Sequence, residues 1–213
     1  MKQMRIRPLF ITGLLFVCGL LVAGSADAAK KKDLTPAPDW HAMTRGEHIA
    51  WLTLTSETKP LVREAMQKRI ASLLKIFPAQ VTTLRDSVVA CVTVPASRLF
   101  LPNGAELSGK GKELLEKLPT LFPGDDFRFI VSVHTANAGS ATYITQLSRQ
   151  RADVVATLLK QRLGAASIVV PYGVGAAEPI ARNNTYQGRE ENRRVEIWLI
   201  PSASWVEKLT AKQ

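Results

Sequence analysis

The stretch "GSATYITQLSRQRADVVATLLKQRLG" at residues 139–164 decides the fold class. Ser140 is a good N-cap, Gly164 is a good helix stop, and apolar residues recur between them at steps of three and four. This pattern predicts a helix of about six turns. Strand patterns flank the helix, because "FRFIVSVH" at 127–134 alternates cleanly and "SIVVPYG" at 167–173 is short and β-rich. A strand, a long helix and a second strand predict a sheet with a helix packed on it.

Further strands and helices lie on both sides of this unit. "SVVACVTV" at 87–94 is β-rich and stops at Pro95, Ser108 can cap a short helix, and "RRVEIWLI" at 193–200 is the last strand. The order is strand-helix-strand-helix-strand-strand, with no internal repeat. We therefore expect an α+β sandwich over residues 86–201, with helices on one face of a mixed sheet.

The N-terminus has the pattern of an export signal. Basic residues open the segment 1–28, an apolar run follows at 8–24, and Ala26-Asp27-Ala28 supplies a small-x-small cleavage site. This predicts a secretory signal peptide, with a retained membrane anchor or lipidation at Cys18 as the alternatives. Cleavage removes three cations and one aspartate, so the formal net charge falls from +10 to +8.

Export and charge restrict the function classes. Cys91 is the only cysteine after residue 28, so no internal disulfide is possible, and no later segment is long and apolar enough to cross a bilayer. A basic surface suits an anionic partner. Nucleic acid is excluded by the predicted export, which leaves acidic wall polymer, lipid head groups or an acidic protein.

Two segments precede the predicted sandwich, and one follows it. Residues 29–44 are a flexible lead with two prolines, and residues 45–85 are a helical extension. Within the extension, "TKPLVREAMQKRIASLLKIF" at 58–77 has one apolar and one basic face. The apolar face must pack either on the C-terminal domain or on a partner protein. Residues 202–213 are a C-terminal tail.

Two arginines fall in apolar rows. Arg151 lies four residues after Leu147 and three before Val154, on the apolar stripe of the long helix. Arg193 begins a strand row that continues with Val195. A buried guanidinium needs an oxygen partner, which can be a carboxylate, backbone carbonyls or an external anion. Nearby glutamates favour an internal ion pair for Arg193, whereas Arg151 has no local acid and is a candidate for binding an external carboxylate bidentately.

An ordered set of residues carries a family resemblance. It comprises Leu147-Ser148, Arg151-Ala152, Gly173 and Gly175, Pro179, Asn183 or Asn184, Gly188-Arg189 and Asn192-Arg193-Arg194-Val195-Glu196. Over residues 90–200 the chain resembles the OmpA C-terminal-like family of peptidoglycan-associated modules. The resemblance implies an OmpA-like β-α-β-α-β-β sandwich, and it leaves the preceding helical extension unexplained.

The resemblance also implies a binding pocket for the diaminopimelate side chain of the cell-wall peptide. In the family an aspartate takes the ligand's ammonium and a helix arginine takes its carboxylate. Arg151 matches the arginine, but Ala136 stands at the aspartate position after Thr135, and Ile144 stands where an asparagine is usual. The predicted carboxylate-binding set is Arg151, Thr135, Arg193 and Leu147. The ammonium half is degenerate, which removes a contact worth about 1.5–3 kcal/mol, or roughly tenfold to a hundredfold in affinity.

These features predict a non-catalytic periplasmic module, associated with the outer membrane or cell wall and binding peptidoglycan weakly. The alternative is an assembly subunit of an envelope-spanning secretion or conjugation machine (type IV-like), in which the OmpA-like domain docks protein. The partners are therefore peptidoglycan or an envelope protein complex. No enzyme, cofactor or metal site is predicted, since His41, His48 and His134 lack ligand spacing and "GKGK" at 109–112 is not a phosphate loop.

Overall fold

The computed structural model describes residues 39–77 and 80–211. The predicted signal peptide, Cys18 and the lead up to residue 38 lie outside these residues. None of the described helices combines the length and apolar character that a membrane span requires.

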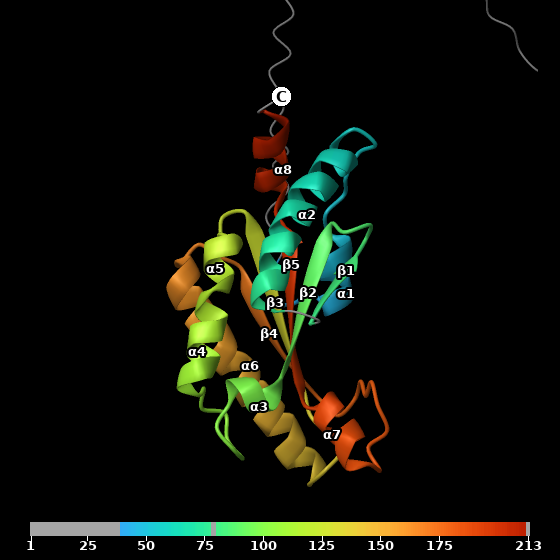
Figure 1. Ribbon diagram of the computed structural model, residues 1–213, viewed down its shortest axis with the longest axis vertical. Helices are drawn as coiled ribbons and strands as arrows, with labels where there is room; N and C mark the ends of the chain where they lie inside the picture. The colour runs from blue at the N-terminus through green and yellow to red at the C-terminus, as the bar shows by residue number, and fades with distance from the viewer. Residues whose placement is uncertain (1–38, 78–79, 212–213) are drawn as a thin grey trace, which may run out of the picture. The chain divides into compact units, whose positions relative to one another are not determined.

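A five-stranded mixed sheet, with the order β1-β2-β5-β3-β4, forms the centre of the described fold (Figure 1). The strands are β1 (Val81–Leu84), β2 (Val89–Pro95), β3 (Phe127–His134), β4 (Val169–Gly175) and β5 (Arg194–Pro201). β3 and β4 are parallel, joined by the long helix α6 (Ala141–Leu163), while β5 pairs antiparallel with both β2 and β3. The predicted α+β fold with a mixed sheet is confirmed.

Local signals set the limits of α6 where the sequence predicts them. The Ser140 hydroxyl accepts a hydrogen bond from the Tyr143 amide over 3.2 Å, and Gly164 ends the helix with a φ of 96°. Gly173 of β4 lets the helix pack close to the sheet, because a Cβ there would lie 2.5 Å from the Arg149 nitrogen. The helix therefore has a fixed rotation over the strands, which decides the direction of its buried side chains.

The domain's own helices cover one face of the sheet, as predicted. This face carries Phe129, Val131 and Val133 of β3, all fully buried. The shorter elements of the domain are α3 (Ala96–Leu99), α4 (Gly109–Glu116), α5 (Leu118–Leu121) and α7 (Tyr186–Asn192). Ser108 caps α4 by accepting from the Gly111 amide over 3.0 Å.

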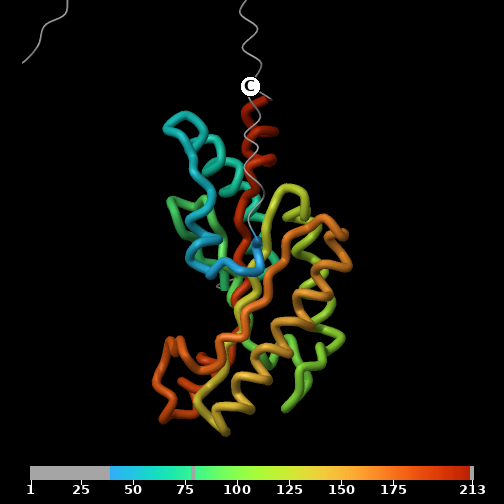
Figure 2. Tube along the Cα trace, turned by 180° about the vertical axis from the view of Figure 1, so that it is seen from behind, coloured from blue at the N-terminus to red at the C-terminus, as the bar shows by residue number. Residues whose placement is uncertain are grey.

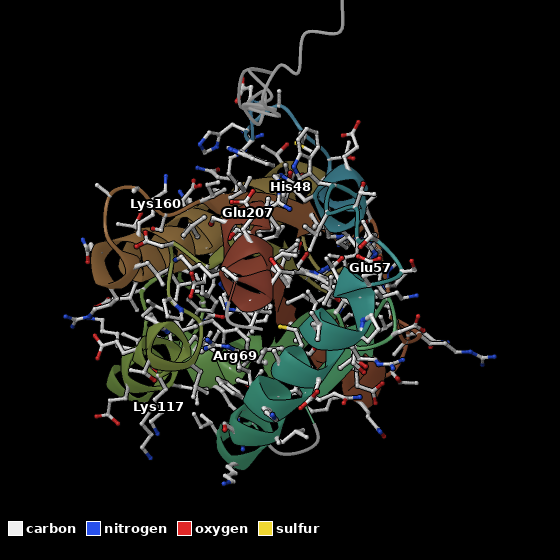
Figure 3. The ribbon with its side chains drawn as sticks, turned by 90° about the horizontal axis from the view of Figure 1, so that it is seen from above. His48, Glu57, Arg69, Lys117, Lys160 and Glu207 are labelled. Carbon is white, nitrogen blue, oxygen red and sulfur yellow. The ribbon has the colours of Figure 1, made fainter. Side chains whose placement is uncertain are left out.

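The helical extension divides between the two faces of the sheet. Helix α1 (Arg45–Ala50) lies on the face opposite α6 (Figure 2). Its buried His48 meets the ring of Tyr172 edge-on, with the ring centroids 6.2 Å apart. Helix α2 (Thr58–Ile76) packs on the α6 side, and Figure 3 shows the two helices apart, with His48 on α1 and Arg69 on α2. Val62, Met66 and Leu73 of α2 are fully buried in the core. The apolar face of α2 therefore packs on the chain's own C-terminal domain, which is one of the two predicted alternatives.

The end of the predicted extension, after α2, contains a strand that the sequence analysis does not predict. Val81–Leu84 form β1, which pairs antiparallel with β2. Three successive residues at 85–87 have positive φ angles and make the turn between the two strands. The Arg85 guanidinium donates to the carbonyls of Ile49 and Leu52, each over 2.7 Å. The strand forms because it pairs with β2, and the local sequence pattern does not indicate this pairing.

The segment predicted as a C-terminal tail at 202–213 contains a helix. Residues Ala203–Thr210 form helix α8, which Ser202 caps by accepting from the Trp205 amide over 3.2 Å. The Trp205 ring is buried, with its centroid 4.8 Å from that of Phe127. The Arg69 guanidinium of α2 lies over both rings, at 5.1 Å and 5.6 Å. This aromatic contact joins the extension and the C-terminus in one core.

Candidate functional site

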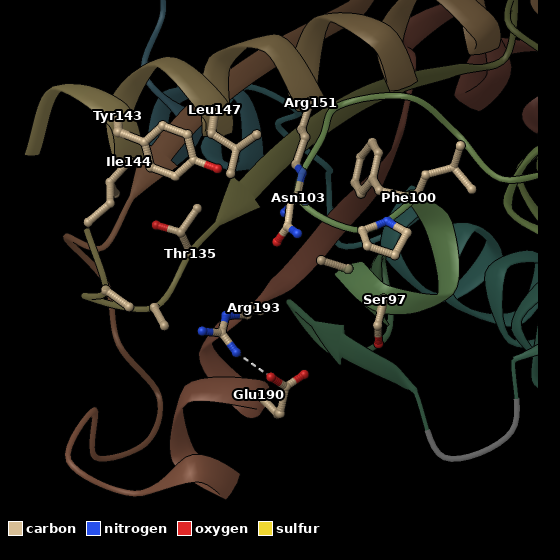
Figure 4. Close-up of a pocket in the computed structure, with 15 residues that line it drawn as sticks. Ser97, Phe100, Asn103, Thr135, Tyr143, Ile144, Leu147, Arg151, Glu190 and Arg193 are labelled. Carbon is tan, nitrogen blue, oxygen red and sulfur yellow. Dashed lines mark hydrogen bonds and ion pairs between the residues drawn. The ribbon is translucent and has the colours of Figure 1, made fainter. Parts of the chain in front are cut away.

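A cavity of about 450 Å³ lies where β3 ends, between α6, the loop after α3 and the end of α7 (Figure 4). All six sequence-predicted site residues line it, and they are Arg151, Thr135, Arg193, Leu147, Ala136 and Ile144. They come from the loop after β3, from α6 and from the end of α7. Sequence reasoning did not identify the opposite wall, which is formed by Phe100 and the loop up to Asn103.

Arg151 is buried in the cavity wall, with 8% of its surface exposed. Its Nε donates to the Gly104 carbonyl over 2.8 Å, and its guanidinium lies 4.8 Å over the ring of Phe100. No oxygen of the described residues accepts a hydrogen bond from its two terminal nitrogens. Burial lowers the pKa of Arg151, the phenol of Tyr143 raises it, and the charge of Arg193 lowers it further. The partner is thus a backbone carbonyl, and the terminal N–H groups remain available to a ligand.

Arg193 reaches the cavity from the end of α7. Its Nη1 pairs with Glu190 Oε1, and the two side chains are about one-third exposed (Figure 4). The predicted internal ion pair is therefore confirmed. The predicted place of Arg193 in a strand row is wrong, because Arg193 is the C-cap of α7 and β5 begins at Arg194. The bend at the helix end turns Arg193 out of the sheet and into the cavity wall.

The rest of the wall combines apolar side chains with the neutral polar groups of Ser97, Asn103, Thr135 and Tyr143. Ala136 and Ile144 are 3% and 6% exposed. Thr135 is also buried, and its amide donates to the Gly175 carbonyl over 2.8 Å, while its Oγ1 has no partner among the described residues. An unpaired buried hydroxyl carries a desolvation cost unless something in the cavity bonds to it.

A rigid loop holds α7 and its two cavity side chains in place. Asn192 is fully buried, and its Oδ1 accepts from the amides of Ile180 and Ala181 over 2.8 and 3.0 Å. Its Nδ2 donates to the Ala181 carbonyl over 2.9 Å and to Asn183 Oδ1 over 3.0 Å. Gly188 is required in α7, because a Cβ there would lie 2.1 Å from the Arg182 carbonyl oxygen. Asn192 and Gly188, which belong to the motif that carries the family resemblance, therefore support the site structurally.

The arrangement suits anion binding. Two guanidinium groups, a hydroxyl and an aromatic ring surround one space, and arginine binds carboxylates through parallel N–H donors. Within residues 39–77 and 80–211, no three His, Cys, Asp or Glu side chains converge to hold a metal ion.

Comparison with known proteins places these residues in a family segment. Residues 99–193 match the model of the OmpA family. The outer-membrane lipoprotein YfiB of Pseudomonas aeruginosa is 39% identical over 105 residues, which are 49% of this chain and 62% of that protein. The peptidoglycan-binding protein ArfA of Mycobacterium tuberculosis is 38% identical over 99 residues, which are 46% of this chain and 30% of that protein. The chain thus spans less than two thirds of each of these relatives.

Two solved structures share the fold. A MotB-like protein from Desulfovibrio vulgaris has a TM-score of 0.57 and 22% identity, covering 68% of this chain and 96% of that one. The cell wall anchor of the type VI secretion system from Pseudomonas aeruginosa has a TM-score of 0.50 and 26% identity, covering 68% and 99%. Residues 99–193 of this chain, which include Arg151, Thr135 and Arg193, form an OmpA family domain.

Proposed function

We propose that this protein is a non-catalytic module of the cell envelope that binds peptidoglycan, with a carboxylate of the wall peptide seated on Arg151. The carrying observation is the buried Arg151 guanidinium, whose Nε is held by the Gly104 carbonyl while its terminal nitrogens line the cavity. A buried cation without a carboxylate partner is costly, and an entering anion relieves that cost. The guanidinium is thus pre-oriented for a ligand.

The comparisons support this proposal. ArfA is named a peptidoglycan-binding protein, and the structure at 26% identity is described as a cell wall anchor. We place the protein in the periplasm, associated with the outer membrane or the wall, since YfiB is named an outer-membrane lipoprotein.

Sedimentation with purified peptidoglycan sacculi tests the proposal. The wild-type protein should pellet with sacculi, and Arg151→Ala should weaken binding by about tenfold to a hundredfold, the size of one lost charge-assisted contact. Arg149→Ala is the matched control, because Arg149 is exposed on the same helix and its loss removes the same charge. This control separates cavity binding from the general attraction between a basic protein and an anionic polymer. Wild-type protein that stays in the supernatant at low salt contradicts the proposal.

A second candidate is an assembly subunit of an envelope-spanning machine, in which the cavity docks protein. The apolar wall at Ala136 and Ile144 favours it, as does the likeness to a secretion-system anchor. Burial of the apolar face of α2 within the chain's own core removes one argument for it. A photo-crosslinker at Tyr143, which lies exposed at the cavity rim, distinguishes the two. A discrete protein adduct in intact cells supports the assembly subunit, and labelled wall fragments alone support the wall-binding module.

A further inference from the structure

The charges of the cavity are unbalanced. Arg151 and Arg193 both line it, close enough that the charge of Arg193 affects the proton affinity of Arg151. Glu190 is the sole acid among the described lining residues, and its carboxylate is already paired with Arg193. The cavity therefore carries one excess positive charge, which attracts a carboxylate and repels a second cation on the same ligand.

The wall beside these arginines offers little to a ligand ammonium. The nearby side chains of Ala136, Ile144 and Leu147 are apolar, and the Ala136 carbonyl already accepts from the Ala138 amide over 2.9 Å. An ammonium placed against this wall loses its hydration and finds no charged acceptor in return. The lining residues Ser97, Asn103 and Tyr143 offer neutral acceptors only. A further neutral acceptor is the Thr135 hydroxyl, which is buried and has no partner among the described residues. A neutral amide N–H matches that acceptor, since one hydroxyl lone pair satisfies it.

We propose that the cavity selects a carboxylate whose neighbouring amino group is acylated, in preference to one beside a free ammonium. This inference rests on the proposed function. A diamino acid of the wall peptide ends in a carbon that bears both a carboxylate and an amine. When the peptide is cross-linked, that amine is an amide and has lost its charge. The preferred ligand is then a cross-linked or otherwise N-acylated stem peptide.

Two synthetic ligands test the selection directly. Both are tripeptides of alanine, γ-linked glutamate and diaminopimelate, and they differ only in acetylation of the side-chain amine. Calorimetric titration into the full-length wild-type protein should show the acetylated peptide binding at least about fivefold tighter, the size of one water-screened charge pair. Ala136→Asp should reverse the order, because it adds a carboxylate to the cavity wall and cancels the excess positive charge.

Each outcome separates the inference from the function on which it rests. If both peptides bind through Arg151 with equal affinity, or the free amine binds tighter, peptidoglycan binding stands and the selection is wrong. If neither peptide binds, the proposed function of this cavity falls, and the selection falls with it. Thermal melts of each variant confirm that it folds.

Arg193 provides a further control. Arg193→Gln removes the excess positive charge of the cavity, so the preference for the acetylated peptide should shrink while both peptides still bind through Arg151. If the ratio of the two affinities is unchanged in this variant, the charge of the cavity does not set the preference and the proposal is overturned.

Discussion

Arg194 and Glu196 lie two residues apart in β5, on the same face of the sheet, and Arg194 Nε donates to Glu196 Oε1 over 2.8 Å. Their side chains are 5% and 13% exposed, beneath α1. Glu196 Oε2 also lies 3.5 Å from His134 Nε2 and 3.7 Å from Arg45 Nη1. One acid thus contacts side chains from three segments and ties the extension to the second face of the sheet.

This cluster predicts an acid-dependent stability. Burial raises the pKa of Glu196, but the adjacent His134 imidazole and the hydrogen-bonded Arg194 guanidinium outweigh it and lower the value to about 2, from an ordinary 4.5. A lowered carboxyl pKa stabilises the fold fully above pH 4.5, and the contribution is lost as the pH falls towards 2. Glu196→Gln should lower the free energy of unfolding at pH 7 by about 3 kcal/mol. Urea unfolding at several pH values between 2 and 7 should show that the free energy of unfolding depends less on pH in the variant than in the wild type. If both free energies change with pH by the same amount, Glu196 is not the group responsible.

Replacing Arg128 with methionine should stabilise the fold, in contrast to replacing Glu196. Arg128 is 3% exposed, its Nε and Nη1 have no partner among the described residues, and its guanidinium lies 4.4 Å over the ring of Trp40. Burial lowers its pKa to about 10, so the charged form is destabilised in the fold. Arg128→Met keeps the packing volume and should raise the free energy of unfolding by about 1 kcal/mol. Arg128→Ala should lower it, because the contact with Trp40 is lost. A methionine variant that melts at a lower temperature contradicts this reasoning.

Asn192 should be costly to replace. Asn192→Ala leaves two amides, a carbonyl and an amide side chain without their buried partner, which should cost about 3 kcal/mol. Asn192→Asp keeps the two acceptor contacts and should lose less. Chemical denaturation measures both, and an alanine variant as stable as wild type excludes a structural role for this network.

The two glycines Gly188 and Gly109 offer a matched comparison. Gly188→Ala places a Cβ 2.1 Å from the Arg182 carbonyl oxygen and 2.9 Å from the Thr185 hydroxyl, so the loop beside the cavity must move. We expect a loss of about 2 kcal/mol and weaker sacculus binding. At Gly109 nothing lies within 4 Å of the added Cβ, and Gly109→Ala should be neutral or stabilise α4 by up to about 1 kcal/mol. Equal melting temperatures for the two variants argue against the close approach at Gly188.

The predicted and observed folds agree where local signals are strong. The α6 helix ends within two residues of its predicted limits because Ser140 and Gly164 act through neighbouring backbone groups. Agreement fails at β1 and α8. The strand at Val81–Leu84 exists through pairing with β2, and α8 is held by packing of Trp205 against Phe127. Neither contact has a signature in its own segment.

The candidate site divides in the same way. Helical periodicity alone placed Arg151 on a buried stripe, because side-chain direction in a helix follows from residue spacing. Its oxygen partner is the Gly104 carbonyl, 47 residues away, which no spacing rule identifies. The sequence by itself therefore determined the elements that have strong local signals, such as α6, and the burial of Arg151, since these depend on neighbours along the chain. The tertiary structure decided that Arg193 lies outside the strand and that Arg194 is the buried arginine at the start of β5. It also decided which walls enclose the cavity. These contacts join segments that meet only after folding.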